Sequence, residues 1–292
     1  MRPYHRLHKK KGVTEHRSQL TYNKVMKLHF YKFDGAGNDF VMVDAREGMA
    51  ELSPQAIALI CHRRKGVGAD GLILLTMRRE DGGVAMRYYN ADGYPADMCG
   101  NGGRCLAMFA HLLGLSHRVG KEATLRFWAD DGEHHATILH WDADRGQGVV
   151  RLSMRDVKKA TLCDVLQGKL LNTGVPHYVQ QVKDLAHYDV VGEGRRLRHH
   201  PDLGPEGANV NFVEPAPDGS LCVRTYERGV EDETWACGTG VTACALVTDI
   251  RHLSTRGGEF EVGFDTTEDG YRNVELTGPV SYNFTGTISV EG

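Results

Sequence analysis

The sequence predicts an α+β protein of two pseudo-symmetric, strand-rich domains, each wrapped around a central helix, with an active site in the cleft between them. Three observations support this prediction. Segments of alternating apolar and polar residues recur along the 292-residue chain, which is typical of half-buried strands. The same landmarks occur twice in the same order. In both copies, a cysteine and a glycine-rich turn directly precede a helix-like apolar run.

The duplication is visible in the spacing of the landmarks. The first half contains GAGNDFV (35–41), MRYY (86–89) and MCGNG (98–102), and the second half contains TGVPHYV (173–179), VRTY (223–226) and ACGTG (236–240). Corresponding positions lie 137 or 138 residues apart throughout. Because three landmarks share one order and nearly one spacing, we expect two similar domains of about 120 to 140 residues rather than a solenoid.

The individual elements follow from alternation and capping signals. The expected strands are 29–33, 40–44, 72–77, 85–90, 124–129, 135–141, 148–154, 177–182, 208–214, 221–227, 272–278 and 285–290. One expected helix covers 53–64, with Ser53 as its N-cap. Two further helices are expected to begin just after Cys99 and just after Cys237. A ligand site between two such domains is a common arrangement.

Composition limits the classes of function. The formal net charge is −3, so no global charge favours nucleic acid or an anionic membrane as a partner. No apolar run approaches the ~18 residues that a spanning helix needs. The seven cysteines are odd in number and follow no secretory signal, which favours a reducing compartment over a disulfide scaffold. They also lack CxxC spacing, so we expect no metal site.

The first 25 residues differ from the rest of the chain. They contain seven Lys or Arg residues, one Glu and little apolar periodicity. We interpret residues 1–25 as a basic, disordered N-terminal extension. A basic arm that binds an anionic partner is the alternative.

The two landmark cysteines suggest the chemistry. At a helix N-terminus, free backbone N–H groups and the helix dipole stabilise a thiolate, and glycines leave those groups open to an anionic ligand. Pseudo-twofold symmetry would place Cys99 and Cys237 on opposite walls of the cleft. One thiolate could then remove a proton from a carbon while the opposite thiol protonates its other face, inverting the carbon without metal or cofactor. The structural alternative is two small, buried residues at helix caps.

Several segments resemble a known family: FDGAGNDFVMVD, GVGADG, YNADGYPADMCGNGGRC, GANVNF, YERGVEDETWACGTG and ELTGPVSYNFTGTI. From about Met26 onward, the chain resembles the diaminopimelate epimerases. The resemblance implies a cytoplasmic, often homodimeric isomerase that interconverts LL- and meso-diaminopimelate without a cofactor, in the biosynthesis of lysine and peptidoglycan. It also implies that the chain end packs back on the first domain, so the predicted domains are 26–145 with 282–292, and 146–281.

The resemblance also implies the roles of individual residues. The acid/base pair is Cys99 and Cys237. The expected substrate-binding residues are polar or lie in the glycine-rich turns: Asn38, Asn90, Gly100, Asn101, Asn209, Glu227, Arg228, Gly238 and Thr239. Among them, 100–101 and 238–239 would cradle the carboxylate at the reacting carbon, and Glu227 with Arg228 would hold the distal amino-acid end. His177 and Glu227 would modulate the thiol pKa values.

Each of these residues also has a structural alternative. Asn38 and Asn90 could be turn residues. His177 could be a buried structural histidine. Glu227 and Arg228 could form a surface ion pair.

The sequence also allows other functions, and three positions depart from the family pattern. The nearest alternative is a racemase of the same fold acting on proline, hydroxyproline or histidine; a thiol redox sensor and a non-catalytic binding module are further alternatives. Val175 stands where the family usually has asparagine, Gly71 where some members have glutamine, and Phe284 where some have a tyrosine linked to dimer formation. Since Asn38 is the internal counterpart of Val175, the two halves differ where substrate contact is expected.

Overall fold

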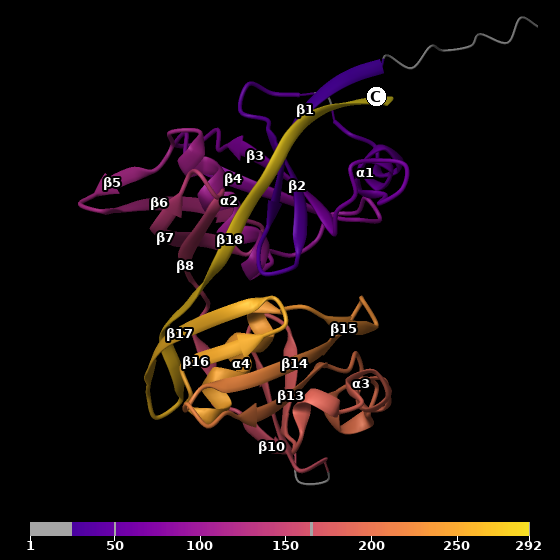
Figure 1. The fold of residues 1–292 in the computed structure, drawn as a ribbon, viewed down its shortest axis with the longest axis vertical. Helices are drawn as coiled ribbons and strands as arrows, with labels where there is room; N and C mark the ends of the chain where they lie inside the picture. The colour runs from indigo at the N-terminus through magenta and orange to yellow at the C-terminus, as the bar shows by residue number, and fades with distance from the viewer. Residues whose placement is uncertain (1–24, 50, 164–165, 292) are drawn as a thin grey trace, which may run out of the picture.

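The computed structural model describes residues 25–49, 51–163 and 166–291, and residues 1–24 of the predicted basic extension lie outside this part. Two lobes are stacked along the long axis, and the last strand runs along both (Figure 1). The α-helices of the described residues are α1 (Pro54–Cys61), α2 (Gly100–Leu112), α3 (Val190–Arg198) and α4 (Gly238–Thr248). None of these described helices is long and apolar enough to cross a membrane.

The strands form one continuous hydrogen-bonded network. The first lobe contains β1 (Val25–Asp34), β2 (Asp39–Asp44), β3 (Gly71–Met77), β4 (Val84–Asn90), β5 (His117–Val119), β6 (Glu122–Ala129), β7 (Gly132–Asp142) and β8 (Gln147–Ser153). The second contains β9 (Val157–Lys158), β10 (Thr161–Cys163), β11 (Gly168–Asn172), β12 (Pro176–Gln181), β13 (Asn209–Pro215), β14 (Leu221–Glu227), β15 (Asp232–Thr234), β16 (His252–Thr255) and β17 (Gly258–Thr266). The long strand β18 (Gly270–Glu291) follows.

Strand pairing repeats between the lobes. In the first lobe, β2–β3 and β4–β6 are parallel, whereas β3–β4 and β6–β7 are antiparallel. In the second lobe, β12–β13 and β14–β16 are parallel, whereas β13–β14 and β16–β17 are antiparallel. This shared topology confirms the predicted α+β fold of two pseudo-symmetric lobes.

The sequence analysis did not predict helix α3, strand β17 or the shorter strands β5, β9, β10, β11, β15 and β16. An offset of 137 residues maps 54–61 onto 191–198, so α3 is the copy of α1. Its Gly192 and Gly194 lower the intrinsic helix propensity, while Asp189 caps its N-terminus through the Gly192 N–H. Strand β17 alternates buried apolar residues with more exposed ones, and this alternation is readable in the sequence.

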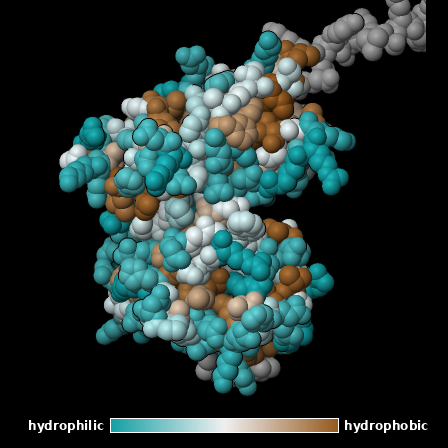
Figure 2. Space-filling view, viewed as in Figure 1, coloured by the Kyte–Doolittle hydropathy of each residue, from teal (hydrophilic) through white to brown (hydrophobic). Residues whose placement is uncertain are grey.

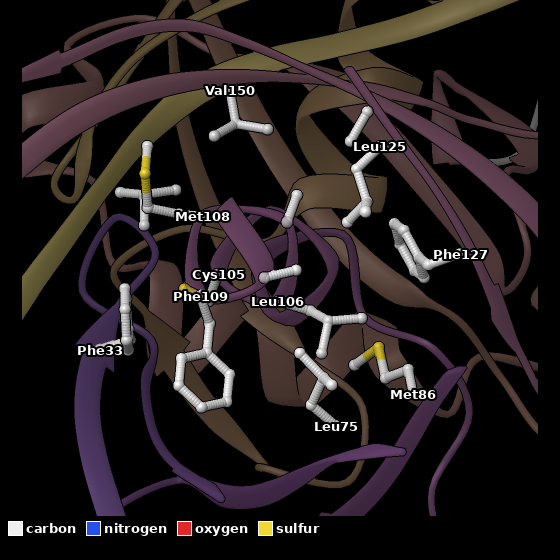
Figure 3. Packing of buried hydrophobic residues seen from close by; sticks show 14 of the residues in the cluster. Phe33, Leu75, Met86, Cys105, Leu106, Met108, Phe109, Leu125, Phe127 and Val150 are labelled. Atoms are coloured by element: carbon white, nitrogen blue, oxygen red, sulfur yellow. The ribbon is translucent and has the colours of Figure 1, made fainter. Parts of the chain in front are cut away.

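Each central helix lies inside its own apolar core. Residues 100–110 of α2 are all buried, and Figure 3 shows Phe33, Met86 and Phe127 arranged around it. The ring of Phe109 lies with its centroid 4.9 Å from that of Tyr31. Helix α4 is buried in a separate core that includes residues of β13 and β17. The two helices are therefore held independently, each by its own lobe.

Strand β18 connects the lobes. It pairs with β17 over 271–277, with β8 over 278–281 and with β1 over 281–291, so the chain end lies against the first lobe (Figure 1). Val150 and Leu152 of β8 belong to the core around α2, and Met154 packs against both cores. The packing thus changes at Met154, after the predicted division between residues 145 and 146.

We expect Phe109→Ala to lower the free energy of unfolding by about 3–5 kcal/mol, because it leaves a cavity in the core around α2. Leu112→Ala on the same helix is the matched control, since this side chain is 39% exposed; it should change stability by less than about 1 kcal/mol. Urea denaturation measures both values. Equal losses in the two variants would contradict the assignment of Phe109 to the core.

Candidate active site

The N-termini of α2 and α4 meet at the boundary between the lobes, and Figure 2 shows that the surface is indented between the two lobes. Cys99 is the N-cap of α2 and Cys237 the N-cap of α4, both with extended backbone. A Cβ on Gly238 would lie 3.6 Å from the Gly100 Cα and 3.3 Å from the Asn101 Oδ1, so the two glycine-rich turns touch. The structure therefore brings the duplicated motifs to one place.

The Cys99 thiol faces an amide oxygen. Its Sγ lies 3.6 Å from Oδ1 of Asn38. The Asn38 Nδ2 donates to Oδ2 of Asp70 at 2.8 Å, and Arg63 donates to the other oxygen of Asp70 at 2.6 Å. Because Asp70 accepts from the amide nitrogen, the amide oxygen is turned toward Cys99, where it accepts from the thiol S–H.

A chain of hydrogen bonds reaches Cys237. Oδ1 of Asn211 accepts from the Thr225 hydroxyl at 2.9 Å, and Nδ2 donates to Nδ1 of His177 at 3.1 Å. Since Nδ1 accepts, the neutral imidazole carries its proton on Nε2, which lies 3.0 Å from the Thr239 Oγ1. The Thr239 hydroxyl, 3.4 Å from the Cys237 Sγ, is then free to donate to the sulfur. Donation from this hydroxyl lowers the pKa of Cys237, against the larger effect of burial.

Burial dominates the charge states of the site. It raises the pKa of both Cys99 and Cys237, and the negative charge of Glu227 raises the pKa of each thiol further. Backbone N–H groups at the start of each helix act in the opposite direction. Burial also raises the pKa of Glu227 and lowers the pKa of His177 to about 3. At neutral pH, both sulfurs in this state of the site are thus thiols and His177 is uncharged.

The remaining predicted residues surround this centre. Oδ1 of Asn209 accepts from the Arg228 backbone N–H at 2.6 Å, and its Nδ2 lies 3.4 Å from Nε2 of His177. The Arg228 guanidinium pairs at 3.2 Å with Glu206, whose side chain is 84% exposed. Asn90 is exposed at the end of β4 and accepts from the Tyr88 hydroxyl at 3.1 Å. Asn90 therefore lies at the margin of the site.

The three departures from the family pattern have distinct surroundings. Val175 directly precedes β12 as Asn38 directly precedes β2, so an apolar side chain occupies the position equivalent to Asn38. Gly71 pairs with Phe40, just as Asn209 pairs with His177. A Cβ on Gly71 would lie only 2.5 Å from the Tyr88 ring, so the glycine makes room for that ring.

Phe284, the third departure, is 48% exposed on β18. Its ring packs edge-to-face against Phe30, with the centroids 6.0 Å apart. Phe284 therefore lies on the surface of the first lobe, within the β1–β18 pair.

Sequence reasoning assigned no role to four residues of the site: Asp70, Tyr88, Asn211, and Arg104, whose NH2 donates to the Asn101 Oδ1 at 3.0 Å. A role for Asn211 could have been predicted from the sequence, because strand periodicity places this residue on the same face as Asn209. Arg104 also stands out in the sequence, because it is a charged residue within a largely apolar predicted helix. Asp70 lies in the GVGADG segment and Tyr88 in the MRYY landmark, but neither segment indicates a role for these two side chains in the site. Among the described residues, no group of three or more His, Cys, Asp or Glu side chains is placed to hold a metal ion.

Comparison with known proteins identifies related sequences. A family model described as diaminopimelate epimerase matches residues 30–150 and 169–280. A diaminopimelate epimerase of Flavobacterium psychrophilum is 40% identical over 272 residues, covering 90% of this chain and 100% of the relative. One from Chlorobaculum tepidum is 40% identical over 268 residues, covering 88% and 99%. One from Archaeoglobus fulgidus is 35% identical over 285 residues, covering 91% and 95%.

Solved structures share the fold at low sequence identity. A hydroxyproline epimerase from Agrobacterium vitis has a TM-score of 0.62 at 15% identity, covering 91% of this chain and 93% of its own. A phenazine biosynthesis protein of the PhzF family from Bacillus anthracis has a TM-score of 0.64 at 16% identity, covering 91% and 99%. These similarities confirm the predicted fold class.

The lowered pKa of His177 predicts a pH effect on stability. Between the unfolded pKa of about 6.5 and the folded pKa of about 3, only the unfolded chain binds this proton, so stability is lost as pH falls. From pH 6 to pH 4, His177→Gln should therefore lose less stability than the wild type, by up to about 1.4 kcal/mol per pH unit. Urea denaturation at several pH values measures the slopes.

The surface residue His187 provides the control for this prediction. Asp184 raises the pKa of His187 through a hydrogen bond, so the stability contributed by His187 is present at low pH. His187→Gln should consequently not flatten the profile. Parallel slopes for the wild type and His177→Gln would contradict the neutral state of His177.

Proposed function

The chain belongs to the diaminopimelate epimerase family of isomerases, and on that premise we propose that Cys99 and Cys237 invert one α-carbon of LL-2,6-diaminopimelate to give the meso isomer. The reaction needs no cofactor. The observation that carries the proposal is the contact between two helix N-termini, each capped by a cysteine. We further place the activity in the cytoplasm, in a homodimer, on the route to lysine and peptidoglycan.

The reaction uses one thiolate and one thiol. The thiolate of one cysteine removes the α-proton and leaves a planar carbanion, and the thiol of the other delivers its proton to the opposite face. The two sulfurs have then exchanged states, and the reverse reaction uses them in the opposite order. The backbone N–H groups of 100–101 and 238–239 would receive the α-carboxylate, onto which the carbanion charge is delocalised.

Substrate binding supports formation of the thiolate. In the structure, burial and Glu227 raise the pKa of both thiols. The α-ammonium of the substrate adds a positive charge between the sulfurs, which favours ionisation of one of them. The hydrogen-bond chain from His177 through Thr239 would stabilise the anion when it resides on Cys237. The base is thus formed where and when a proton must be removed.

The second amino-acid end of the proposed substrate would be bound by polar side chains around the site. Arg228 would exchange its exposed partner Glu206 for the distal carboxylate, which a guanidinium binds with two parallel hydrogen bonds. Asn38, Asn90, Asn209 and Glu227 would supply further contacts to the zwitterion. A racemase of proline, hydroxyproline or histidine is the second candidate, favoured by the apolar Val175 in place of a substrate-binding amide. The requirement for Arg228 discriminates between these candidates.

Incubation with LL-diaminopimelate in deuterated water tests the proposal. We expect deuterium at the α-carbon and formation of the meso isomer, both followed by NMR. Cys99→Ser and Cys237→Ser should each abolish net epimerisation. Cys222→Ser, on β14 and half-buried, is the matched control and should retain activity.

The outcomes of this experiment separate the classes of function. No α-proton exchange with reduced thiols would contradict the proposal. Full epimerase activity in Cys99→Ser would contradict the two-base mechanism. Affinity for the substrate without any exchange would indicate a binding module instead.

Replacing Arg228 tests the distal contact. Arg228→Met should raise the KM for LL-diaminopimelate by about 10- to 100-fold, because a charge-assisted hydrogen bond contributes roughly 1.5–3 kcal/mol. Arg196→Met, which removes an exposed arginine paired with Glu193, is the control and should leave KM unchanged. Unchanged KM in Arg228→Met, with activity on proline, would favour the second candidate.

A further inference from the structure

We propose that Arg104 is a positioning residue: its buried guanidinium fixes the Asn101 amide that bridges the two helix turns, and so sets the separation of Cys99 and Cys237. This inference rests on the proposed two-thiol reaction. It assigns a task to a charged residue that the reaction itself does not use.

Arg104 is buried without a charged partner in contact. Its side chain is 0% exposed. NH1 donates to the Gly100 carbonyl at 3.3 Å and NH2 to the Asn101 Oδ1 at 3.0 Å, both uncharged oxygens. Nε has no hydrogen-bond partner among the described residues. Burying such a charge is unfavourable, so stability of the fold does not explain why an arginine occupies this position.

The guanidinium lies where the two lobes and β18 meet. It stands 5.1 Å from the centroid of the Phe260 ring of β17. A Cβ on Gly278 of β18 would lie 3.2 Å from the Arg104 Cζ. Arg104 therefore extends from α2 of the first lobe onto elements that belong to the second lobe and to the connecting strand.

Through Asn101, Arg104 acts on the distance between the sulfurs. Because Oδ1 of Asn101 accepts from Arg104, Nδ2 is directed the other way. It donates to the Ala236 carbonyl at 3.1 Å, and Ala236 directly precedes Cys237. The same Nδ2 lies 3.5 Å from the Asn38 oxygen that faces Cys99. One correctly oriented amide thus links the surroundings of both thiols across the lobe boundary.

The duplicated helix provides an internal comparison. The offset of 138 residues maps Arg104 onto Thr242 of α4. Thr242 is also fully buried, and its Oγ1 donates at 2.9 Å to the Gly238 carbonyl, the counterpart of the Gly100 carbonyl. Each residue therefore donates to the equivalent carbonyl of its own helix. Arg104 alone continues beyond it to the bridging amide, which singles out that second contact.

The position also gives Cys99 a positive neighbour. The charged or titratable groups that interact with Arg104 are Cys99, Cys105 and Asp34, and those that interact with Cys99 include Glu227. Arg104 lowers the pKa of Cys99, against the larger effect of burial. Thr242, the counterpart of Arg104 near Cys237, is uncharged. Loss of the charge at Arg104 should therefore change the pKa of Cys99 and leave that of Cys237 unchanged.

Two substitutions separate geometry from charge. Arg104→Met keeps an apolar chain of similar length but removes the hydrogen bonds and the charge, whereas Arg104→Lys keeps the charge and loses the planar fork. With LL-diaminopimelate, Arg104→Met should lower kcat by about 10- to 100-fold and change KM by less than about threefold, because small misplacements of reacting groups reduce rates on this order. Arg104→Lys should remain at least about tenfold impaired in kcat. Thr242→Val is the matched control and should retain kcat.

A second readout does not depend on activity. Alkylation of each cysteine by iodoacetamide, followed by peptide mass spectrometry over a range of pH, reports on each thiol separately. Arg104→Met should shift the Cys99 profile to higher pH and slow its alkylation at pH 8, because loss of the guanidinium charge raises the pKa of Cys99. The Cys237 profile should stay unchanged. Arg104→Lys should restore the Cys99 profile without restoring kcat.

Several results would overturn the proposal. Wild-type kcat in Arg104→Met would show that the bridge does not need the guanidinium. Full recovery of kcat in Arg104→Lys would reduce the role of Arg104 to its charge. Failure of both variants to fold, judged by circular dichroism, would make Arg104 a residue required by the fold. If the wild type itself shows no α-proton exchange, the proposed function fails, whereas the alkylation profiles still decide whether Arg104 acts on Cys99.

Discussion

The structure depends on one geometric constraint: the N-termini of α2 and α4, each capped by a cysteine, are held in contact across the boundary between the lobes. Each helix is buried in the core of its own lobe, which holds its first turn rigidly. The lobes are then aligned by β18, which pairs with strands of both. The position of each thiol is thus a consequence of packing within a lobe, and their separation a consequence of how the lobes are joined.

Duplication supplies two equivalent positions, but the side chains around them have diverged. In the second lobe, His177 pairs with Asn209 and continues a polar chain toward Cys237. In the first lobe, the same register pairs Phe40 with Gly71, and Cys99 instead faces the Asn38 amide. Such asymmetry suits the proposed reaction, in which the two sulfurs hold different protonation states at any moment. The backbone of the two lobes is thus pseudo-symmetric, whereas the polar side chains around the two cysteines differ.

The sequence predicts features that are local or periodic. Alternation located most strands, and the repeated CG(N/T)G turns located both central helices. The same repeat could have located α3, whose glycines conceal it. Contacts between residues distant in the chain were beyond reach: the pairing of Asn38 with Asp70 and of His177 with Asn211 depends on strand register that only packing determines. Likewise, apolar alternation does not reveal that β8 packs on the first core and Met154 on both.

The charge states connect this architecture to chemistry. A cleft that excludes water strengthens each electrostatic interaction within it, yet it also opposes formation of the thiolate that the proposed reaction needs. The groups that favour a thiolate at Cys237 are uncharged: they are backbone N–H groups at the helix N-terminus and the Thr239 hydroxyl next to a neutral His177. Among the described residues that contact Cys237, no fixed positive charge therefore keeps it permanently ionised. A buried thiol is far less reactive toward oxidants than a thiolate. If the substrate ammonium completes the ionisation, as the proposed function requires, the sulfurs are reactive only while the substrate occupies the space between them.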